Sequence, residues 1–302
     1  MHVLKVGYMF VAVLSDKPEI REQFCKMVGK ETGKDDISFY NTNFQGRLIT
    51  LVEPSLYPDK IQPLLYTLSI SDYVVLLVET LTPKIGELIV ALNSLKMDKG
   101  VIVTCVNLPL SGTVLEKYEK VADMAAAKEK VLSLQASEAS QEMIALVDKS
   151  FAVKSVGNVA LGVMKSGTMK KHDKLFLLPD KKEIEIRTIQ INDKDVEEAK
   201  TGDRFGVAYK GDILERGVLV PLRNEFQVEN IVNGKFSQSP FFKDELKGKI
   251  HAYSNMQFIE GNVSDSELRL DRPMAFQKGE SVAVVDASNQ KLRIAGVFQS
   301  KW

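Results

Sequence analysis

The stretch FAVKSVGNVALGVMKSGTMKKHDKLFLL, residues 151–178, and the later stretch AKTGDRFGVAYKGDILERGVLV, residues 199–220, decide the fold of this chain. Short apolar runs rich in β-branched residues alternate here with glycines and charged turns. The runs cover residues 159–164, 175–178, 184–189, 205–209 and 218–220. Several short strands at this spacing predict a small antiparallel β-barrel.

Four motifs in this stretch follow one another in a fixed order. They are F-x-(V/I)-x-x-x-G-x-V-x-x-G-x-(V/M)-x-x-G from Phe151, K-x-x-D-K from Lys170, A-x-x-G-D-x-x-G-V from Ala199 and E-R-G-V-L from Glu215. The set resembles the second domain of translational GTPases, the family of elongation factor Tu, elongation factor one-alpha and the selenocysteine-specific factor. Within it, the set is most similar to small archaeal factors that have been called pyrrolysine elongation factors. The resemblance implies an α/β domain with a GTPase-like, doubly wound parallel sheet, followed by two small all-β antiparallel barrels.

The composition is that of an ordinary globular protein, since 44% of the 302 residues are hydrophobic and 26% are charged. Because 40 basic residues balance 40 acidic ones, a nucleic-acid role needs a local basic patch. No signal peptide is visible, and no apolar run nears the roughly 20 residues that span a bilayer. Cys25 and Cys105 lie in apolar segments, which predicts reduced, buried thiols in a cytoplasmic protein. The histidines have no metal-ligand spacing, so no metal site is expected.

Strands and helices alternate over residues 1–149, which predicts a mostly parallel sheet with helices on its faces. We expect strands at residues 9–14, 73–78 and 101–106, and a hairpin of residues 37–41 and 47–52. Helices are expected to begin with Asp16 and Thr82 at their N-caps. A charged helix over residues 113–130, a strand at 131–134 and a helical turn within 141–147 complete the predicted domain.

The segment after the first predicted strand departs from the phosphate-binding loop of the family. That loop reads GxxxxGK followed by Ser or Thr, because backbone N–H groups wrap the phosphate, the lysine neutralises it and the hydroxyl holds Mg²⁺. Here Ser15 and Ile20 replace the glycines, Arg21 the lysine and Glu22 the hydroxyl. A carboxylate about 4 Å from a phosphate charge costs on the order of 4 kcal/mol at an effective dielectric of about 20. We expect Arg21 and Glu22 to lie instead on a solvated helix face.

The other nucleotide motifs are replaced as well. Glu53 and Leu56 stand at the ends of the metal-side DxxG, and Tyr57 stands where translational factors carry the histidine that orients the attacking water. Asn107 lies in the segment that replaces the guanine-reading NKxD, and this segment has no carboxylate. Residues 29–37 are too few for the mobile effector loop. We therefore expect a GTPase fold without GTP hydrolysis and without a cofactor; GTP and Mg²⁺ remain an option only if this interpretation of the motifs is wrong.

Residues 224–302 resemble the third domain of elongation factor Tu. The segments that carry the resemblance are SPFFK at residues 239–243, RPMAFQKGESVAVVD at 272–286 and IAGVF at 294–298. Strands are expected at residues 281–285 and 292–298. The predicted domains are therefore residues 1–149, 150–222 and 223–302.

The family resemblance also implies that the second domain holds the 3′ end of an aminoacyl-tRNA. By position, Asp148 matches an acidic residue of the family, Phe151 an aromatic residue and Leu161 a threonine. Asp148 is equally compatible with a surface carboxylate at a strand end. Phe151 is expected to pack in the barrel rather than to stack on a base. A basic cluster forms the second candidate site, although a basic turn is more often only solvated: Lys165, Lys170, Lys171, His172 and Lys174.

Three functions fit these observations. The first is a translation-factor-like protein that binds aminoacyl-tRNA, the ribosome or both without a nucleotide switch. The second is an interaction or regulatory module that uses the shape of a factor to bind another protein. The third, an active GTPase with divergent motifs, is disfavoured by the motif losses. No membrane partner is expected for any of them.

Overall fold

The computed structural model describes residues 9–135, 142–246 and 248–301. The chain divides into two compact units. One unit holds residues 1–137 together with Gln238–Lys247 and Ala283–Val297, and the other holds Glu138–Ser237, Gly248–Val282 and the C-terminal residues from Phe298.

The first unit is built on a seven-stranded mixed sheet in the order β2-β3-β4-β1-β5-β6-β7. Strand β1 is parallel to β4 and β5, and β5, β6 and β7 continue in parallel, whereas β2, β3 and β4 are joined by antiparallel pairing. The parallel core and the hairpin confirm the predicted layout. The strands are β1 Met9–Leu14, β2 Lys30–Lys34, β3 Ser38–Phe44, β4 Arg47–Glu53, β5 Tyr73–Val78, β6 Gly100–Thr104 and β7 Glu119–Val121.

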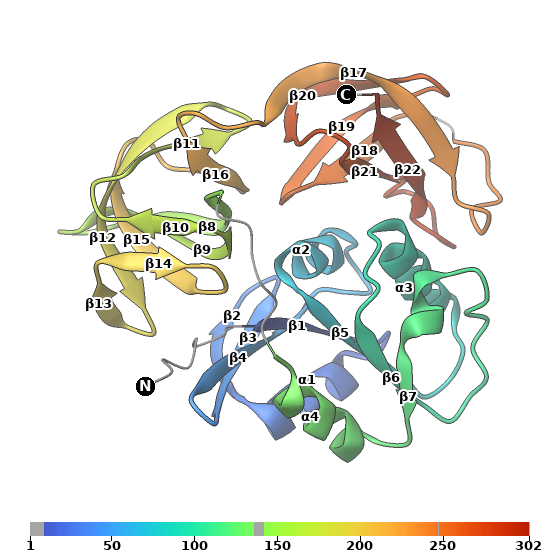
Figure 1. Cartoon of the computed structure of the whole chain (residues 1–302). Helices are drawn as coiled ribbons and strands as arrows, with labels where there is room; N and C mark the ends of the chain where they lie inside the picture. The colour runs from blue at the N-terminus through green and yellow to red at the C-terminus, as the bar shows by residue number, and fades with distance from the viewer. Residues whose placement is uncertain (1–8, 136–141, 247, 302) are drawn as a thin grey trace. The chain divides into compact units, whose positions relative to one another are not determined.

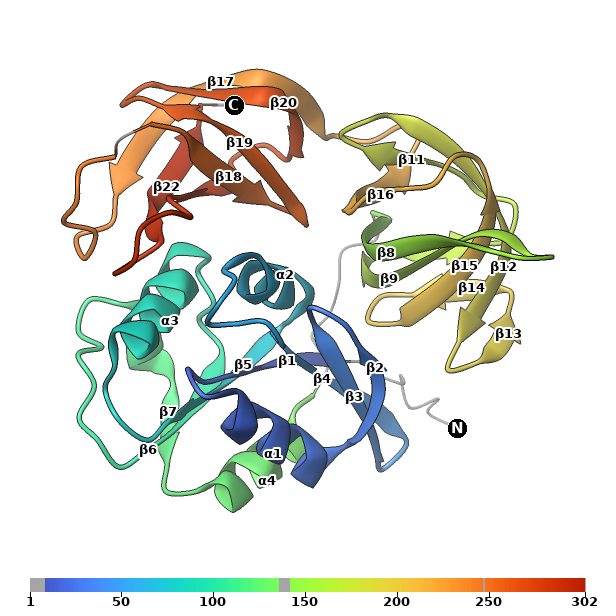
Figure 2. The ribbon, with the colours of Figure 1, turned by 180° about the vertical axis from the view of Figure 1, so that it is seen from behind.

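Four helices cover the two faces of this sheet. Figures 1 and 2 show α1 (Pro18–Val28) and α4 (Met124–Ser133) on one face, and α2 (Gln62–Ile70) and α3 (Pro83–Ser94) on the other. Helix α1 packs a stripe that includes Phe24 and Cys25 against the central strands. Cys25 is buried as predicted, but Cys105 is exposed because the chain has already left β6 when it reaches this residue.

Local capping chemistry accounts for the helix starts. Thr82 caps α3 by accepting a hydrogen bond from the Ile85 N–H, as predicted. The prediction of Asp16 as a cap was wrong, since α1 begins at Pro18 with Lys17 at its N-cap. The Asp16 carboxylate instead accepts the Thr82 hydroxyl at 2.7 Å, so it ties together two loops that follow neighbouring strands.

The secondary structure predicted for the end of the first domain was wrong. Residues 113–130 do not form one helix, because a 3-10 turn (Val114–Lys117) and β7 come first, and α4 starts only where Asp123 caps it. The predicted strand at residues 131–134 is the end of α4 and the residue after it. Residues 144–147 begin the long strand β8 (Ile144–Val153) rather than a helical turn, while residue 141 lies outside the described residues.

The second unit contains the barrel that the opening stretch predicted. Its strands run in the order β11-β16-β8-β9-β15-β12-β13, and β11 also pairs with β12, which closes the ring. Strand β8 belongs to this barrel from Ile144 onward, so the barrel begins before the predicted boundary at residue 150. Gly162 is required at a crossing, because a Cβ there would collide with the Leu146 carbonyl oxygen and the Phe205 ring. The further bounds are β9 Gly157–Ser166, β11 Lys174–Leu178, β12 Lys182–Ile191, β13 Lys194–Val196, β15 Arg204–Lys210 and β16 Gly217–Pro221, with a two-stranded ribbon of β10 Thr168–Lys170 and β14 Glu198–Lys200.

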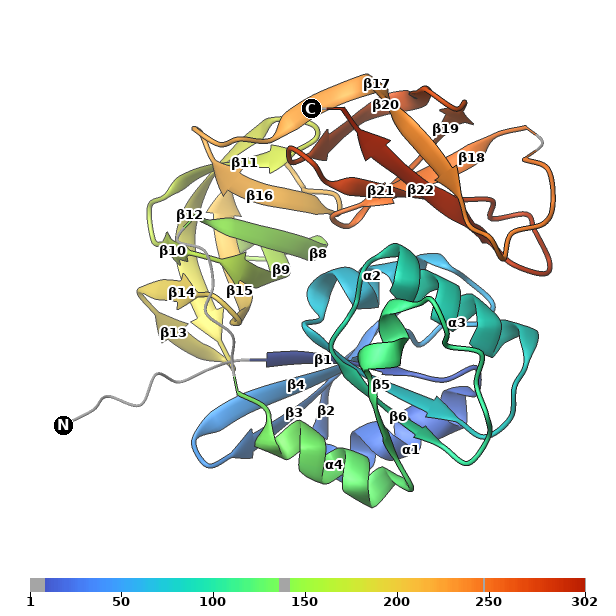
Figure 3. The same cartoon turned by 45° about the vertical axis from the view of Figure 1, so that its right-hand side comes forward.

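The last barrel closes in the order β17-β20-β19-β18-β21-β22 (Figure 3). Its predicted strand at residues 281–285 has the bounds of β21, and the strand predicted from residue 292 begins at Ile294. In the SPFFK segment Phe242 is buried, whereas Phe241 is 46% exposed. The strands are β17 Gln227–Gln238, β18 Ile250–Ser254, β19 Gln257–Val263, β20 Glu267–Phe276, β21 Ser281–Val285 and β22 Ile294–Ser300.

Candidate functional site

The loops that follow the parallel strands meet at one edge of the first sheet, where ligands bind in open α/β folds. Residues 15–17 follow β1, residues 54–61 follow β4, and residues 79–82 follow β5. Four of the residues that replace the phosphate-binding and metal-side motifs meet at this edge through hydrogen bonds: Ser15, Arg21, Glu53 and Tyr57. Asn107 lies in the loop after β6, and its side chain is exposed.

Arg21 occupies the centre of this edge. Its guanidinium donates to the carbonyl oxygens of Ser15 (2.7 Å), Pro54 (3.0 Å) and Tyr57 (2.8 Å), and to the Glu53 carboxylate at 3.3 Å. The side chain is 0% exposed. The prediction of a solvated Arg21 was therefore wrong, because three carbonyl oxygens from two loops and the Glu53 carboxylate at the end of β4 satisfy the group inside the fold. Glu22, its neighbour, does lie on the solvated face and pairs with Lys26 at 2.7 Å.

The loop between β1 and α1 is too short to wrap a phosphate. Only Ser15, Asp16 and Lys17 separate the strand from the helix, and Pro18 at the first turn of the helix has no N–H to donate. Ile20 is already inside the helix, where its side chain packs into the hydrophobic core. The position of the second family glycine thus belongs to a helix rather than to a loop.

Burial dominates the electrostatics of the Arg21–Glu53 pair. Burial lowers the pKa of Arg21, with the Glu53 charge opposing the shift. Burial likewise raises the pKa of Glu53, against the charge and hydrogen bond of Arg21. Burial removes the hydration of both side chains, so the charged form of each is stabilised in the interior by the other.

Tyr57 is also buried, and its hydroxyl is hydrogen-bonded within the fold. It donates to the Lys84 carbonyl oxygen at 2.8 Å and to the Glu87 carboxylate at 3.3 Å. Burial, with the Glu87 charge, raises the pKa of Tyr57 well above its usual range. Leu56, one residue earlier, is 41% exposed at the surface of the same loop.

No effector segment separates α1 from the next strand. Gly29 alone connects Val28 at the end of α1 to Lys30 at the start of β2. The Thr32 hydroxyl donates to the Phe39 carbonyl oxygen across the β2–β3 pair, so it serves the sheet. This agrees with the expectation that residues 29–37 are too few for a mobile loop.

In the second barrel, Asp148 is buried and paired rather than at a surface strand end. Its carboxylate accepts two hydrogen bonds from the Arg204 guanidinium, at 3.3 and 3.1 Å, and its carbonyl oxygen accepts one from Arg216. The register of β8 and β9 shifts between Val147 and Lys149, so Asp148 is the extra residue at this irregularity, and it is 6% exposed. The surface interpretation was therefore wrong.

Phe151 points outward, contrary to prediction. The side chain is 37% exposed, and it lies opposite Val159 in the β8–β9 pair. Leu161, on β9 opposite Lys149, is half-buried. The hairpin thus carries all three positions matched to the family, with the aromatic ring accessible.

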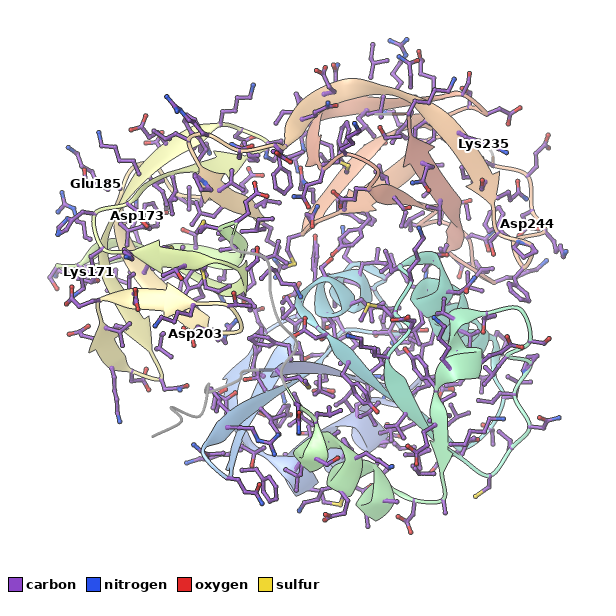
Figure 4. The ribbon with its side chains drawn as sticks, viewed as in Figure 1. Lys171, Asp173, Glu185, Asp203, Lys235 and Asp244 are labelled. Atoms are coloured by element: carbon purple, nitrogen blue, oxygen red, sulfur yellow. The ribbon has the colours of Figure 1, made fainter. Side chains whose placement is uncertain are left out.

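The predicted basic cluster lies elsewhere on the barrel and is interleaved with carboxylates. Lys171 pairs with Glu197 at 2.6 Å, Lys170 with Glu198 at 4.0 Å, and Lys174 with Glu183 at 4.0 Å. His172 occupies the exposed turn, and Lys165 is half-buried on β9. Figure 4 shows Lys171, Asp173 and Glu185 on this side of the barrel. No purely basic surface results from these residues.

Sequence reasoning missed four charged residues that the structure places at the two sites. Arg204 and Arg216 surround Asp148, while Glu87 and Arg293 adjoin Tyr57. One feature of the sequence indicates that Glu87 is buried. The residues around it in α3 are nearly all apolar, and a helix of this composition is buried. Among the described residues no helix is long and apolar enough to cross a membrane, and no three His, Cys, Asp or Glu side chains gather as metal ligands.

Some known proteins are similar to the second barrel alone, and others to nearly the whole chain. A family model described as elongation factor Tu domain 2 matches residues 157–218. The uncharacterized protein MJ0325 of Methanocaldococcus jannaschii is 32% identical over 297 residues, covering 89% of this chain and 94% of that protein. The selenocysteine-specific elongation factor of the same organism is 30% identical over 117 residues, which are 37% of this chain and 25% of that factor.

Solved structures share the fold. Translation elongation factor SelB from Methanococcus maripaludis, in complex with the GTP analogue GPPNHP, superposes with a TM-score of 0.82 at 18% identity, covering 99% of this chain and 80% of that one. The apo form of that factor gives a TM-score of 0.76 at 17% identity, over 97% of this chain and 79% of that one. At these identities the likeness concerns the architecture, a mixed sheet followed by two barrels. The chain belongs to one family with its nearly full-length relative MJ0325, and the matches to elongation factor Tu domain 2 and to the selenocysteine-specific elongation factor make it similar to the translational GTPases.

Proposed function

We propose that this chain is a translation elongation factor-like protein that binds aminoacyl-tRNA, the ribosome or both without hydrolysing GTP, in the cytoplasm. The observation that carries the proposal is the Arg21–Glu53 pair in the place of the phosphate and metal motifs. The family's architecture supports a translation partner, and the altered nucleotide edge supports the loss of the switch.

The residues at this edge do not fit a Mg²⁺-bound guanosine triphosphate. The loop after β1 is short and begins its helix with a proline, and the Arg21 guanidinium fills the centre. Glu53 is committed to Arg21, and no hydroxyl side chain follows Arg21 along α1 to hold the metal. A triphosphate would have to displace an ion pair and three hydrogen bonds to backbone oxygens.

Titration with a fluorescent GTP analogue in the presence of Mg²⁺ tests the nucleotide half of the proposal. We expect no saturable binding at micromolar concentrations, because the cradle is filled by side chains of the chain itself. A translational GTPase with intact motifs serves as the positive control. Micromolar, Mg²⁺-dependent binding would overturn the proposal.

The RNA half of the proposal rests on Phe151, whose exposed ring is available to stack on a base. Stacking of this kind contributes about 1–3 kcal/mol, so Phe151→Ala is expected to weaken binding of aminoacylated tRNA by about 5- to 150-fold. Phe241→Ala is the matched control, because Phe241 is also an exposed phenylalanine but lies in the loop between β17 and β18. Gel shifts with total aminoacylated tRNA and the same tRNA after deacylation, at two salt concentrations, measure the effect.

A protein-interaction module is the second candidate function. The carboxylates paired with Lys170, Lys171 and Lys174 favour it, because they reduce the attraction of this surface for phosphate. Equal retention, or no retention, of charged and deacylated tRNA would favour this module over the tRNA carrier. A fall in affinity with Phe241→Ala but not with Phe151→Ala would place RNA contact outside the second domain.

A further inference from the structure

The loop of residues 54–61, between β4 and α2, is held on one side by Arg21. The Arg21 guanidinium donates to the carbonyl oxygens of Pro54 and Tyr57, at 3.0 and 2.8 Å. It also bonds Glu53, the last residue of β4. One buried cation therefore fixes the start and the middle of this loop.

Arg293 holds the same loop from another side. This residue belongs to the segment Ala283–Val297 of the same compact unit. Its guanidinium donates to the Asp59 carbonyl oxygen at 3.2 Å and lies 5.7 Å from the centre of the Tyr57 ring. Both oxygens of Glu87 accept from the Arg293 side chain, and one also accepts from the Arg293 N–H at 2.9 Å.

Tyr57 links the two arginines. Its carbonyl oxygen is an acceptor for Arg21, its ring lies under Arg293, and its hydroxyl shares the Glu87 carboxylate with Arg293. Arg21, Glu87 and Tyr57 are all nine-tenths or more buried, so water does not compete effectively for these bonds. Both cations have a carboxylate partner inside the fold, Glu53 for Arg21 and Glu87 for Arg293.

We propose that Arg21 and Arg293 form a two-sided clamp that holds residues 54–61 in one conformation in the absence of any nucleotide. In GTPases the corresponding loop is ordered by contacts to the γ-phosphate and Mg²⁺ and is released on hydrolysis. Here the guanidinium groups of Arg21 and Arg293 hold the loop in place of those contacts. The loop therefore has no nucleotide-dependent state. A partner that contacts the exposed Leu56 therefore meets the same surface whether or not GTP is present. This inference rests on the proposed loss of the nucleotide switch.

Hydrogen exchange of the full-length chain tests the clamp directly. The amides of Tyr57 and Lys60 donate to the carbonyl oxygens of Pro54 and Leu56, at 3.0 and 2.8 Å, and are expected to be protected. Their exchange is expected to be unchanged by about 1 mM GTP with Mg²⁺, which is on the order of a thousand times a micromolar Kd. Arg293→Gln is expected to accelerate their exchange by about tenfold while strands of the second barrel keep theirs. Lys84→Gln is the matched control, because Lys84 also approaches Glu87, at 3.6 Å, but only its backbone touches Tyr57.

The double variant Glu87→Gln/Arg293→Gln guards against a folding defect, since it leaves no unpaired charge in the interior. It should show the same local acceleration. Rapid exchange of residues 54–61 in the unmodified chain, or no change in either Arg293 variant, would overturn the clamp while leaving the proposed function intact. GTP-dependent protection of the loop together with GTP binding by calorimetry would overturn both.

Discussion

Arg21→Met is expected to lower the free energy of unfolding by about 3–5 kcal/mol, because it leaves the Glu53 carboxylate buried without its cation. Glu53 is 5% exposed and sits at the end of a central strand, so it has little access to water. Urea unfolding at pH 7, followed by circular dichroism, measures the change. Lys26→Met is the matched control, because the Lys26–Glu22 pair is solvated and is expected to contribute little to stability.

The double variant Arg21→Met/Glu53→Gln separates two parts of this loss. Removing both charges should restore the part that comes from the unpaired carboxylate. The carbonyl oxygens of Ser15, Pro54 and Tyr57 would still lack their donor, and each such group costs about 1–3 kcal/mol when buried. Recovery should therefore be partial. A loss below about 1 kcal/mol in the single variant would contradict the assignment of Arg21 as the filling of the cradle.

The fold was largely predictable because its signals are local. The runs of apolar residues that predicted β9, β11, β12, β15 and β16 have the period and punctuation that a barrel requires. The helix after Thr82 begins where its cap predicted. The region after β6 was not predictable in this way, because the three-residue edge strand β7 and a single 3-10 turn leave too short a pattern to distinguish from a helix.

The candidate sites were predictable in position but not in environment. Arg21 has the sequence context of an exposed residue on an amphipathic helix, and its burial depends on carbonyl oxygens from residues 15, 54 and 57. Phe151 follows the alternation of a strand, but the register shift beside Asp148 reverses which side chains face the barrel interior. Both errors arise from tertiary contacts that no spacing along the chain encodes.

The Glu87–Arg293 pair could not be predicted from the sequence for a related reason. The two residues are separated by 206 positions, and neither belongs to a motif. The apolar surroundings of Glu87 in α3 indicate that the residue needs a partner, but they do not identify it. The partner follows only once the segment Ala283–Val297 is known to share a compact unit with α3.

Glu87→Gln is expected to cost about 3–5 kcal/mol at pH 7 and progressively less as the pH falls below 4.5. Burial alone would raise the pKa of Glu87, but hydrogen bonds and charge from Arg293 outweigh it, so the pKa is lowered from 4.5. The folded state therefore binds fewer protons than the unfolded state in this window. The stability contributed by the carboxylate is complete above pH 4.5 and is lost as the pH falls through the folded pKa. Urea unfolding of both proteins between pH 3 and pH 7, roughly the range in which carboxylates titrate, measures the difference.

The Arg21 variant should respond to acid in a different range, which distinguishes the two buried pairs. The pKa of Glu53 is raised by burial even with Arg21 present, and removal of the cation removes the influence that opposes the rise. In Arg21→Met, Glu53 should therefore take up a proton above pH 4.5, and the stability deficit should shrink before the deficit of Glu87→Gln does. Identical pH profiles for the two variants would contradict the opposite pKa directions. The opposite pKa directions in the unmodified chain follow from geometry, because Glu87 receives hydrogen bonds from both the side chain and the backbone of Arg293, whereas Glu53 receives a single bond of 3.3 Å from Arg21.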